Sequence, residues 1–192
     1  MILVLSLLYI ALMAGLFIYF LIKHDTSRWQ VAIGGVLVSA LPLLLLRMKR
    51  IPFSIPIIIG YFVFIMCSTL LGSIAKFYLH FTWWDSTLHL YKGAYVGFVA
   101  LTLCKICIPE RVLSGVSRWL IFLFVLSLAV FASVLWEIYE FAGDLFYTDT
   151  MQRGGNKDTM YDLLAGFAGG LVIAIYGFFQ RQTGSSGVEE TK

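Results

Sequence analysis

Charged residues are scarce in this chain. Only 13% of its 192 residues are Asp, Glu, Lys or Arg, whereas 60% are hydrophobic. A typical soluble domain has about 25% charged residues, and only about half of its residues are apolar. The shortage of charge excludes a soluble globular protein, and the long apolar runs indicate an integral membrane protein.

Basic tracts and paired cysteines are scarce as well. The densest basic run is at residues 47–50, and no predicted helix has a basic face, so we expect no nucleic-acid partner. The three cysteines are Cys67, Cys104 and Cys107. Cys104 and Cys107 form a C-x-x-C pair, but neither a preceding strand nor a second ligand pair accompanies it, as a redox or zinc motif would require. We therefore predict that all three are apolar packing residues.

Six apolar segments are each long enough to cross a bilayer as a helix, which takes about 20 residues. They cover residues 2–22, 30–46, 54–78, 83–107, 117–147 and 158–179. The predicted fold class is an all-α, polytopic membrane helix bundle, with residues 1–181 forming a single domain. Pro42 is expected as a tolerated kink late in the second span. Residues 182–192 are rich in Gly, Ser and Glu and are predicted to be a disordered tail.

The distribution of Lys and Arg predicts the orientation of these spans. Six spans place both termini on one side, and the loops and ends on that side contain more Lys and Arg than the opposite loops. Basic residues favour the cytoplasmic side, so we predict cytoplasmic termini. The first span alone favours the reverse orientation, because Lys23 and Arg28 follow it and nothing basic precedes it.

Polar residues gather at three helix ends that this topology places on the same side of the membrane. These ends are the start of the fourth span, the end of the fifth and the start of the sixth. On each helix the polar residues lie three or four positions apart and so share a face. They are Asp85 and His89, Glu137 and Glu140, and Asp158 and Asp162. His89 and Asp162 each lie about 6 Å inward of the acid that opens their helix, so their depths agree.

The fourth and sixth spans share a further pattern. Each acid pair or Asp–His pair is followed at the same spacing by two glycines: Gly93 and Gly97 in one helix, Gly166 and Gly170 in the other. Glycines four residues apart let membrane helices approach closely. The pattern predicts two helices that cross tightly beside a shared polar pocket.

Carboxylates and an imidazole on converging helices can bind a divalent cation. We take Asp85, His89, Glu137 and Asp162 as candidate metal ligands. All six polar residues, Glu140 and Asp158 included, are candidate catalytic groups. Without a metal, neighbouring carboxylates repel each other and some would keep a proton, which suits general acid catalysis or proton relay.

Other roles for these residues remain open. Lys92, Arg153 and Lys157 could neutralise the acids or bind an anionic headgroup. Asp85 and Asp158 could each be a first-turn carboxylate that the helix dipole favours.

The order of these motifs resembles a known family. The stretches from Asp85 to Gly93, from Trp136 to Glu140 and from Gly155 to Gly166 are similar to motifs of the YjdF-like family of small bacterial inner-membrane proteins. The overall plan is also similar to that of the VanZ-like proteins, which are linked to glycopeptide resistance. The resemblance covers residues 80–172 and implies a bacterial inner-membrane location. It implies the same six site residues but no particular reaction.

Three functions fit the sequence. The first is an outward-facing, metal-assisted membrane enzyme that acts on a lipid-linked or cell-envelope substrate. The second is a small proton-coupled transporter, which the clustering of acids near one membrane face disfavours. The third is a non-catalytic accessory protein whose polar cluster joins three helices. The lipid bilayer is the one partner that all three require.

Overall fold

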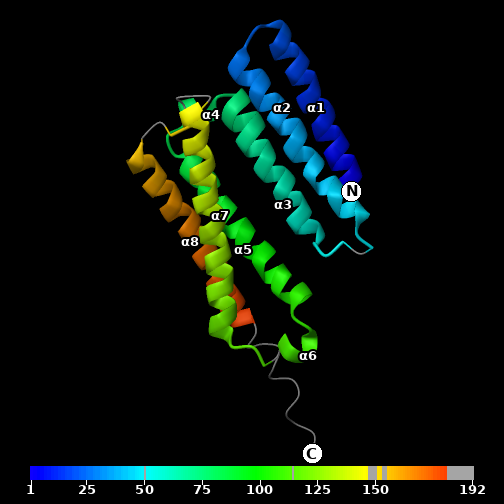
Figure 1. Ribbon diagram of the computed structural model, residues 1–192, viewed down its shortest axis with the longest axis vertical. Helices are drawn as coiled ribbons and strands as arrows, with labels where there is room; N and C mark the ends of the chain where they lie inside the picture. Colours follow the sequence, from blue (N-terminus) through cyan, green and yellow to red (C-terminus); the bar gives the residue numbers. More distant parts are fainter. Residues whose placement is uncertain (50, 114, 147–150, 153–154, 181–192) are drawn as a thin grey trace, which may run out of the picture. The chain divides into compact units, whose positions relative to one another are not determined.

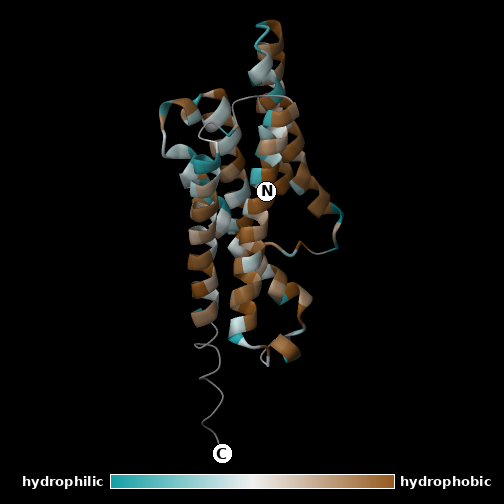
Figure 2. Ribbon diagram, turned by 60° about the vertical axis from the view of Figure 1, so that its left-hand side comes forward, coloured by the Kyte–Doolittle hydropathy of each residue, from teal (hydrophilic) through white to brown (hydrophobic). Residues whose placement is uncertain are grey.

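The computed structural model describes residues 1–49, 51–113, 115–146, 151–152 and 155–180. The described chain is all-helical, as predicted. Six helices are long and apolar enough to cross a membrane, and in Figure 2 hydrophobic residues run along their length. They are Ile2–Ile22, Thr26–Arg47, Ile55–Ile74, Trp84–Cys107, Arg118–Phe146 and Asn156–Gln180. The predicted tail at 182–192 lies outside the described residues.

The chain divides into two compact units, of which the first is Met1–Leu88 and the second begins at His89. The single-domain organisation therefore stays a prediction.

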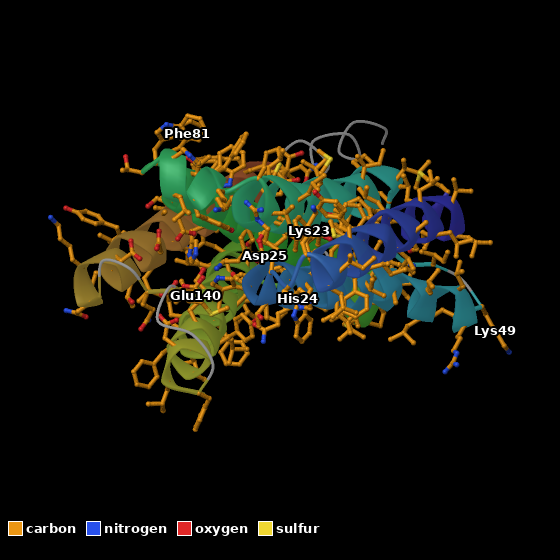
Figure 3. The ribbon with its side chains drawn as sticks, turned by 90° about the horizontal axis from the view of Figure 1, so that it is seen from above. Lys23, His24, Asp25, Lys49, Phe81 and Glu140 are labelled. Carbon is orange, nitrogen blue, oxygen red and sulfur yellow. The ribbon has the colours of Figure 1, made fainter. Side chains whose placement is uncertain are left out.

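The first unit begins with a helical hairpin of α1 (Ile2–Ile22) and α2 (Thr26–Ala40). A tight turn joins the two helices, and Figure 3 labels Lys23, His24 and Asp25 in it. Asp25 caps α2, because its Oδ1 accepts a hydrogen bond from the backbone N–H of Arg28 at 3.1 Å. This cap starts the helix at Thr26, earlier than the predicted residue 30.

Proline changes the end of the second span more than predicted. The α-helix stops at Ala40, and the chain continues as the 3-10 helix η1 (Leu41–Arg47), with Pro42 at its start. Proline has no backbone N–H and its ring clashes with the preceding turn, so it ends the α-helical ladder here. The span nevertheless continues through Pro42 to Arg47, and its last turns have 3-10 geometry.

The third span changes helix type halfway. α3 (Ile55–Ile65) continues as the π-helical segment η2 (Met66–Ile74). The carbonyl of Ile65, where the change occurs, accepts hydrogen bonds from the Tyr9 hydroxyl at 3.1 Å and from Thr69 Oγ1 at 2.6 Å. Side chains that compete for helix carbonyls are a common cause of such wide turns. The span ends at Ile74 rather than at the predicted residue 78.

A left-handed residue separates that span from the next short helix. Lys76 has φ 64°, and α4 (Phe77–His80) follows it. In Figure 1 the three longer helices α1, α2 and α3 of this unit run side by side.

The second unit contains most of α5 (Trp84–Cys107), the short α6 (Glu110–Leu113), α7 (Arg118–Phe146) and α8 (Asn156–Gln180). α7 and α8 are neighbours over much of their length (Figure 1). A fully apolar core forms towards one end of the helices and includes Ala100, Val125 and Ala174. Cys104 is part of this core, as predicted, whereas Cys107 is exposed at the end of α5.

Candidate functional site

Three buried polar side chains meet where α5, α7 and α8 come together in the second unit. They are His89, Glu137 and Asp162, with exposed fractions of 2%, 6% and 1%. One ligand atom from each side chain lies within 4.8 Å of the others. The expected convergence of these three helices is therefore present in the structure.

Small residues explain why the three side chains converge. Each of them lies four residues from a close helix contact: His89 from Gly93, Asp162 from Gly166, and Glu137 from Ser133. A Cβ atom on Gly93 would collide with the carbonyl oxygen of Gly166, and one on Gly166 would collide with Ser133 Oγ. The backbones therefore touch at this level, and residues one turn away point into the same space.

Other glycines of α8 extend the contact. A Cβ on Gly169 would meet the backbone of Leu90 and Ala94, and one on Gly170 would lie 2.5 Å from the Ala129 Cβ. On α8, the predicted tight crossing of the fourth and sixth spans thus depends on Gly169 as much as on Gly166 and Gly170 of the sequence pattern.

The site lies inside the helices rather than at their tips. At 1.5 Å rise per residue, His89, Glu137 and Asp162 each lie about 8–14 Å from the nearer end of α5, α7 and α8. Ionisable residues at such depth are costly, and they commonly mark a function.

A buried lysine joins the cluster. Lys92 is 7% exposed, and its Nζ lies 3.2 Å from His89 Nδ1, one turn away on the same helix. The ammonium also lies over the ring of Trp136, 4.7 Å from its centroid. Since an ammonium has donors only, Nδ1 is the acceptor in the contact between Lys92 and His89.

The contact between His89 and Glu137 is longer. Glu137 Oε1 lies 3.4 Å from His89 Nδ1. That oxygen is buried and makes no hydrogen bond to any described residue. The lone pair of Nδ1 already faces Lys92, so the imidazole has no proton on this nitrogen to offer to the carboxylate. A buried carboxylate oxygen in this situation is energetically unfavourable unless a proton or a cation accompanies it.

The remaining predicted acids lie further out and are half-buried. Glu140 on α7, labelled in Figure 3, accepts a hydrogen bond of 2.7 Å from Trp136 Nε1. Asp158 lies in the first turn of α8. Asp85 lies in the first turn of α5, within the first unit, so its place beside the cluster stays a prediction. Figure 2 shows hydrophilic residues near one end of the α7–α8 pair.

Asp144 has a local structural role. Its two carboxylate oxygens accept the backbone N–H groups of Met151, at 2.9 Å, and of Gln152, at 2.7 Å. Two charge-assisted hydrogen bonds fix the chain where it turns back from α7 towards α8. Arg153, a candidate for neutralising the acids, lies outside the described residues, and Lys157 lies over the Tyr161 ring.

Thr159 is a further residue of the site that was not predicted from the sequence. Its side chain hydrogen-bonds to Glu137, and its Oγ1 also accepts a hydrogen bond of 3.0 Å from Gln152 Nε2. Thr159 thus links the returning chain to the buried carboxylate. A threonine in the first turn of a helix is too common for the sequence to single it out.

Together these features define a class: a multi-pass membrane protein with a buried carboxylate–histidine–lysine cluster in its second unit. A family model described as "Predicted membrane protein (DUF2238)" matches residues 4–183. The chain therefore belongs to the DUF2238 family of predicted membrane proteins.

Two further comparisons add to this. The chain is similar to a Thermotoga maritima protein described as "Uncharacterized protein", with 33% identity over 108 residues. The alignment covers 55% of this chain and 53% of that protein, so it spans about half the length of the relative. No solved structure matches the chain.

Proposed function

We propose that the chain is a membrane enzyme that binds a divalent cation through His89, Glu137 and Asp162 and acts on a lipid-linked or cell-envelope substrate. The observation that supports this is the meeting of three buried ligand atoms within 4.8 Å in otherwise apolar helices. Asp85, one turn before His89 on the same helix, is the proposed fourth ligand. Glu140 and Asp158 are proposed as acid or base groups at the outer edge of the site.

The donor set suits a transition metal. Two carboxylates and an imidazole are typical ligands of Zn²⁺, Fe²⁺ or Mn²⁺. A bound divalent ion would compensate the Glu137 oxygen that lacks a hydrogen bond among the described residues. Such an ion polarises an oxygen of the substrate or activates a water molecule.

The position of the cluster supports an amphiphilic substrate. It lies about 8–14 Å inside the helix ends, a depth at which a lipid headgroup or the polar part of an envelope precursor meets a membrane protein. With cytoplasmic termini in a bacterial inner membrane, this end of the helices faces outward. The YjdF-like and VanZ-like resemblance supports the same residues.

A non-catalytic accessory protein is the second candidate, and the contact between Lys92 and His89 favours it. The ammonium contributes a positive charge beside His89 and interacts electrostatically with Glu137 without any metal. In this alternative the cluster only joins α5, α7 and α8.

Elemental analysis of the full chain in mild detergent separates the two candidates. The samples are wild type, Asp162→Asn and His89→Ala, with Asp25→Asn as a matched control, since Asp25 caps α2 in the first unit. Near-stoichiometric metal in wild type and Asp25→Asn, lost in the two site variants, would support the metal centre. If every sample is normally stable but contains no metal, the metalloenzyme proposal is contradicted and the accessory role remains.

A further inference from the structure

The cluster has one basic residue that a metal centre does not need. Lys92 Nζ lies 3.2 Å from His89 Nδ1, and Glu137 Oε1 lies 3.4 Å from the same nitrogen. A cation shared by His89 and Glu137 would therefore bind Nδ1. The ammonium and the cation cannot both use this lone pair, and two positive charges at such a distance repel strongly in a low-dielectric interior.

Lys92 can leave His89 without leaving the site. Its ammonium sits on a flexible four-carbon stem and already rests over the Trp136 ring, 4.7 Å from the centroid. A cation–π contact of this kind compensates part of the lost hydrogen bond. Trp136 is itself fixed by the 2.7 Å hydrogen bond to Glu140. The charge would thus remain beside the cation after Nδ1 is released.

With a divalent cation bound, the charges of the cluster do not balance. The buried ionisable side chains described in the second unit are His89, Lys92, Glu137 and Asp162. With a divalent cation present, its two charges and the ammonium exceed the two carboxylates by one positive charge. A net charge buried at membrane depth is unfavourable, so an anion would complete the site.

We propose that Lys92 is the anion-binding residue of this site and that the anion is a phosphate group, which takes one oxygen to the divalent cation and another to the ammonium. This inference rests on the proposed metal centre. Phosphate has several anionic oxygens and is commonly bound between a lysine and a metal ion. Cation and phosphate then bind cooperatively, because each stabilises the state in which Lys92 has left His89.

Titration of Mn²⁺ into metal-free full-length protein tests this coupling. The protein is embedded in nanodiscs of a phosphate-free galactolipid that contain either phosphatidic acid or diacylglycerol, which differ by the phosphate alone. A third sample has diacylglycerol discs with inorganic phosphate in solution. We expect wild type to bind Mn²⁺ at least about fivefold more tightly with phosphatidic acid than with diacylglycerol.

Lys92→Met should abolish that difference. In diacylglycerol discs it should bind Mn²⁺ at least as tightly as wild type, because His89 Nδ1 is already available. Lys105→Met is the matched control, an exposed lysine near the other end of α5, and it should keep the coupling. Lys92→Arg should also keep it, since it preserves the charge, and it serves as the test if Lys92→Met does not fold.

The outcomes are separable. Tighter Mn²⁺ binding with phosphatidic acid alone supports a lipid phosphate, and the same gain with inorganic phosphate supports a free phosphate as the ligand. Coupling that persists in Lys92→Met, or that is lost in Lys92→Arg while Mn²⁺ still binds, overturns the inference and leaves the metal centre intact. Wild type that binds no Mn²⁺ in any disc overturns both.

Discussion

The two units bury polar side chains of different kinds. In the first unit they are hydroxyls that donate to backbone carbonyls: Tyr9 to Ile65, Ser39 to Gly35, and Tyr61 to Val38. In the second unit Ser133 also donates to a backbone carbonyl, that of Ala129, but the other buried polar side chains are ionisable. Some of these contact one another across helices, as Glu137 and His89 do.

This difference has a physical basis. A hydroxyl in a helix needs one acceptor, and a nearby backbone carbonyl provides it, so the burial of a hydroxyl in lipid costs little free energy. Where the carbonyl belongs to another helix, the hydrogen bond also holds the two helices together. A carboxylate or an ammonium needs compensating charge, which has to come from other helices or from a ligand. Most buried hydroxyls described in the first unit are therefore satisfied within it, with Ser6 Oγ as an exception. In the second unit the ionisable groups compensate one another only in part, because one oxygen of Glu137 makes no hydrogen bond to a described residue.

The largest expected difference between the two units is the effect on stability of replacing a helix glycine by alanine. Gly93→Ala should destabilise the protein by about 1–3 kcal/mol or more, because the new Cβ would strike the backbone of Gly166. Gly34→Ala in α2 is the control, since a Cβ there meets nothing within 4 Å, and it should stabilise the helix by about 1 kcal/mol. Thermal unfolding in detergent measures both. Equal effects of the two variants would contradict the tight crossing at Gly93.

Glu137→Gln should separate metal binding from stability. The amide keeps the shape of the side chain but removes a proposed ligand, so Mn²⁺ affinity should fall by more than about 100-fold, beyond the loss expected for an outer hydrogen bond. The metal-free variant should be no less stable than wild type, because the like charge beside Asp162 is gone. A lower melting temperature with unchanged Mn²⁺ affinity would assign the residue a purely structural role.

Thr159→Val should produce an intermediate effect. It removes the hydrogen bond to Glu137 while keeping the branched shape of the side chain. Loss of such an orienting partner lowers metal affinity by about 10–100-fold. Thr159→Ser should restore the affinity, since it retains the hydroxyl. Mn²⁺ titration of the pair measures the effect, and equal affinities in the Val and Ser variants would argue against an orienting role.

Tyr9→Phe should have the smallest effect. It removes the hydroxyl that contacts Ile65 O at 3.1 Å and Thr69 Oγ1 at 2.7 Å in the first unit. We expect a loss of about 1 kcal/mol in stability and no change in Mn²⁺ affinity. Weaker Mn²⁺ binding in this variant would show that the polar groups of the first unit also serve the site.

Most of the fold could be predicted from the sequence, because a bilayer-spanning helix requires a long apolar run and each of the six is present. The boundaries differ from the prediction where single side chains change the backbone hydrogen bonds of a helix. Asp25 began α2 early, Pro42 converted its end to a 3-10 helix, and Tyr9 and Thr69 took the Ile65 carbonyl where η2 begins. The contact between Tyr9 and Ile65 joins two helices, which periodicity does not reveal, whereas the effects of Asp25 and Pro42 are local.

The candidate site was also partly predictable. His89, Glu137 and Asp162 stood out because ionisable residues are rare in apolar helices, and the glycine spacing indicated the crossing that brings helices together. Thr159 could not be found, because its importance comes from the chain that Asp144 turns back towards α8. The sequence does not reveal the role of Lys92 for a similar reason, since its contact with Trp136 joins two helices.

The sequence by itself thus determined the environment: a chain with so little charge and six long apolar runs has to fold in a membrane, where each polar residue is conspicuous. Only the tertiary structure decided which of those residues meet. Helical spacing fixes the face on which a side chain lies, but the glycine contacts between helices set which faces touch. That packing separated the buried His89, Glu137, Asp162 and Lys92 from the half-buried acids further out.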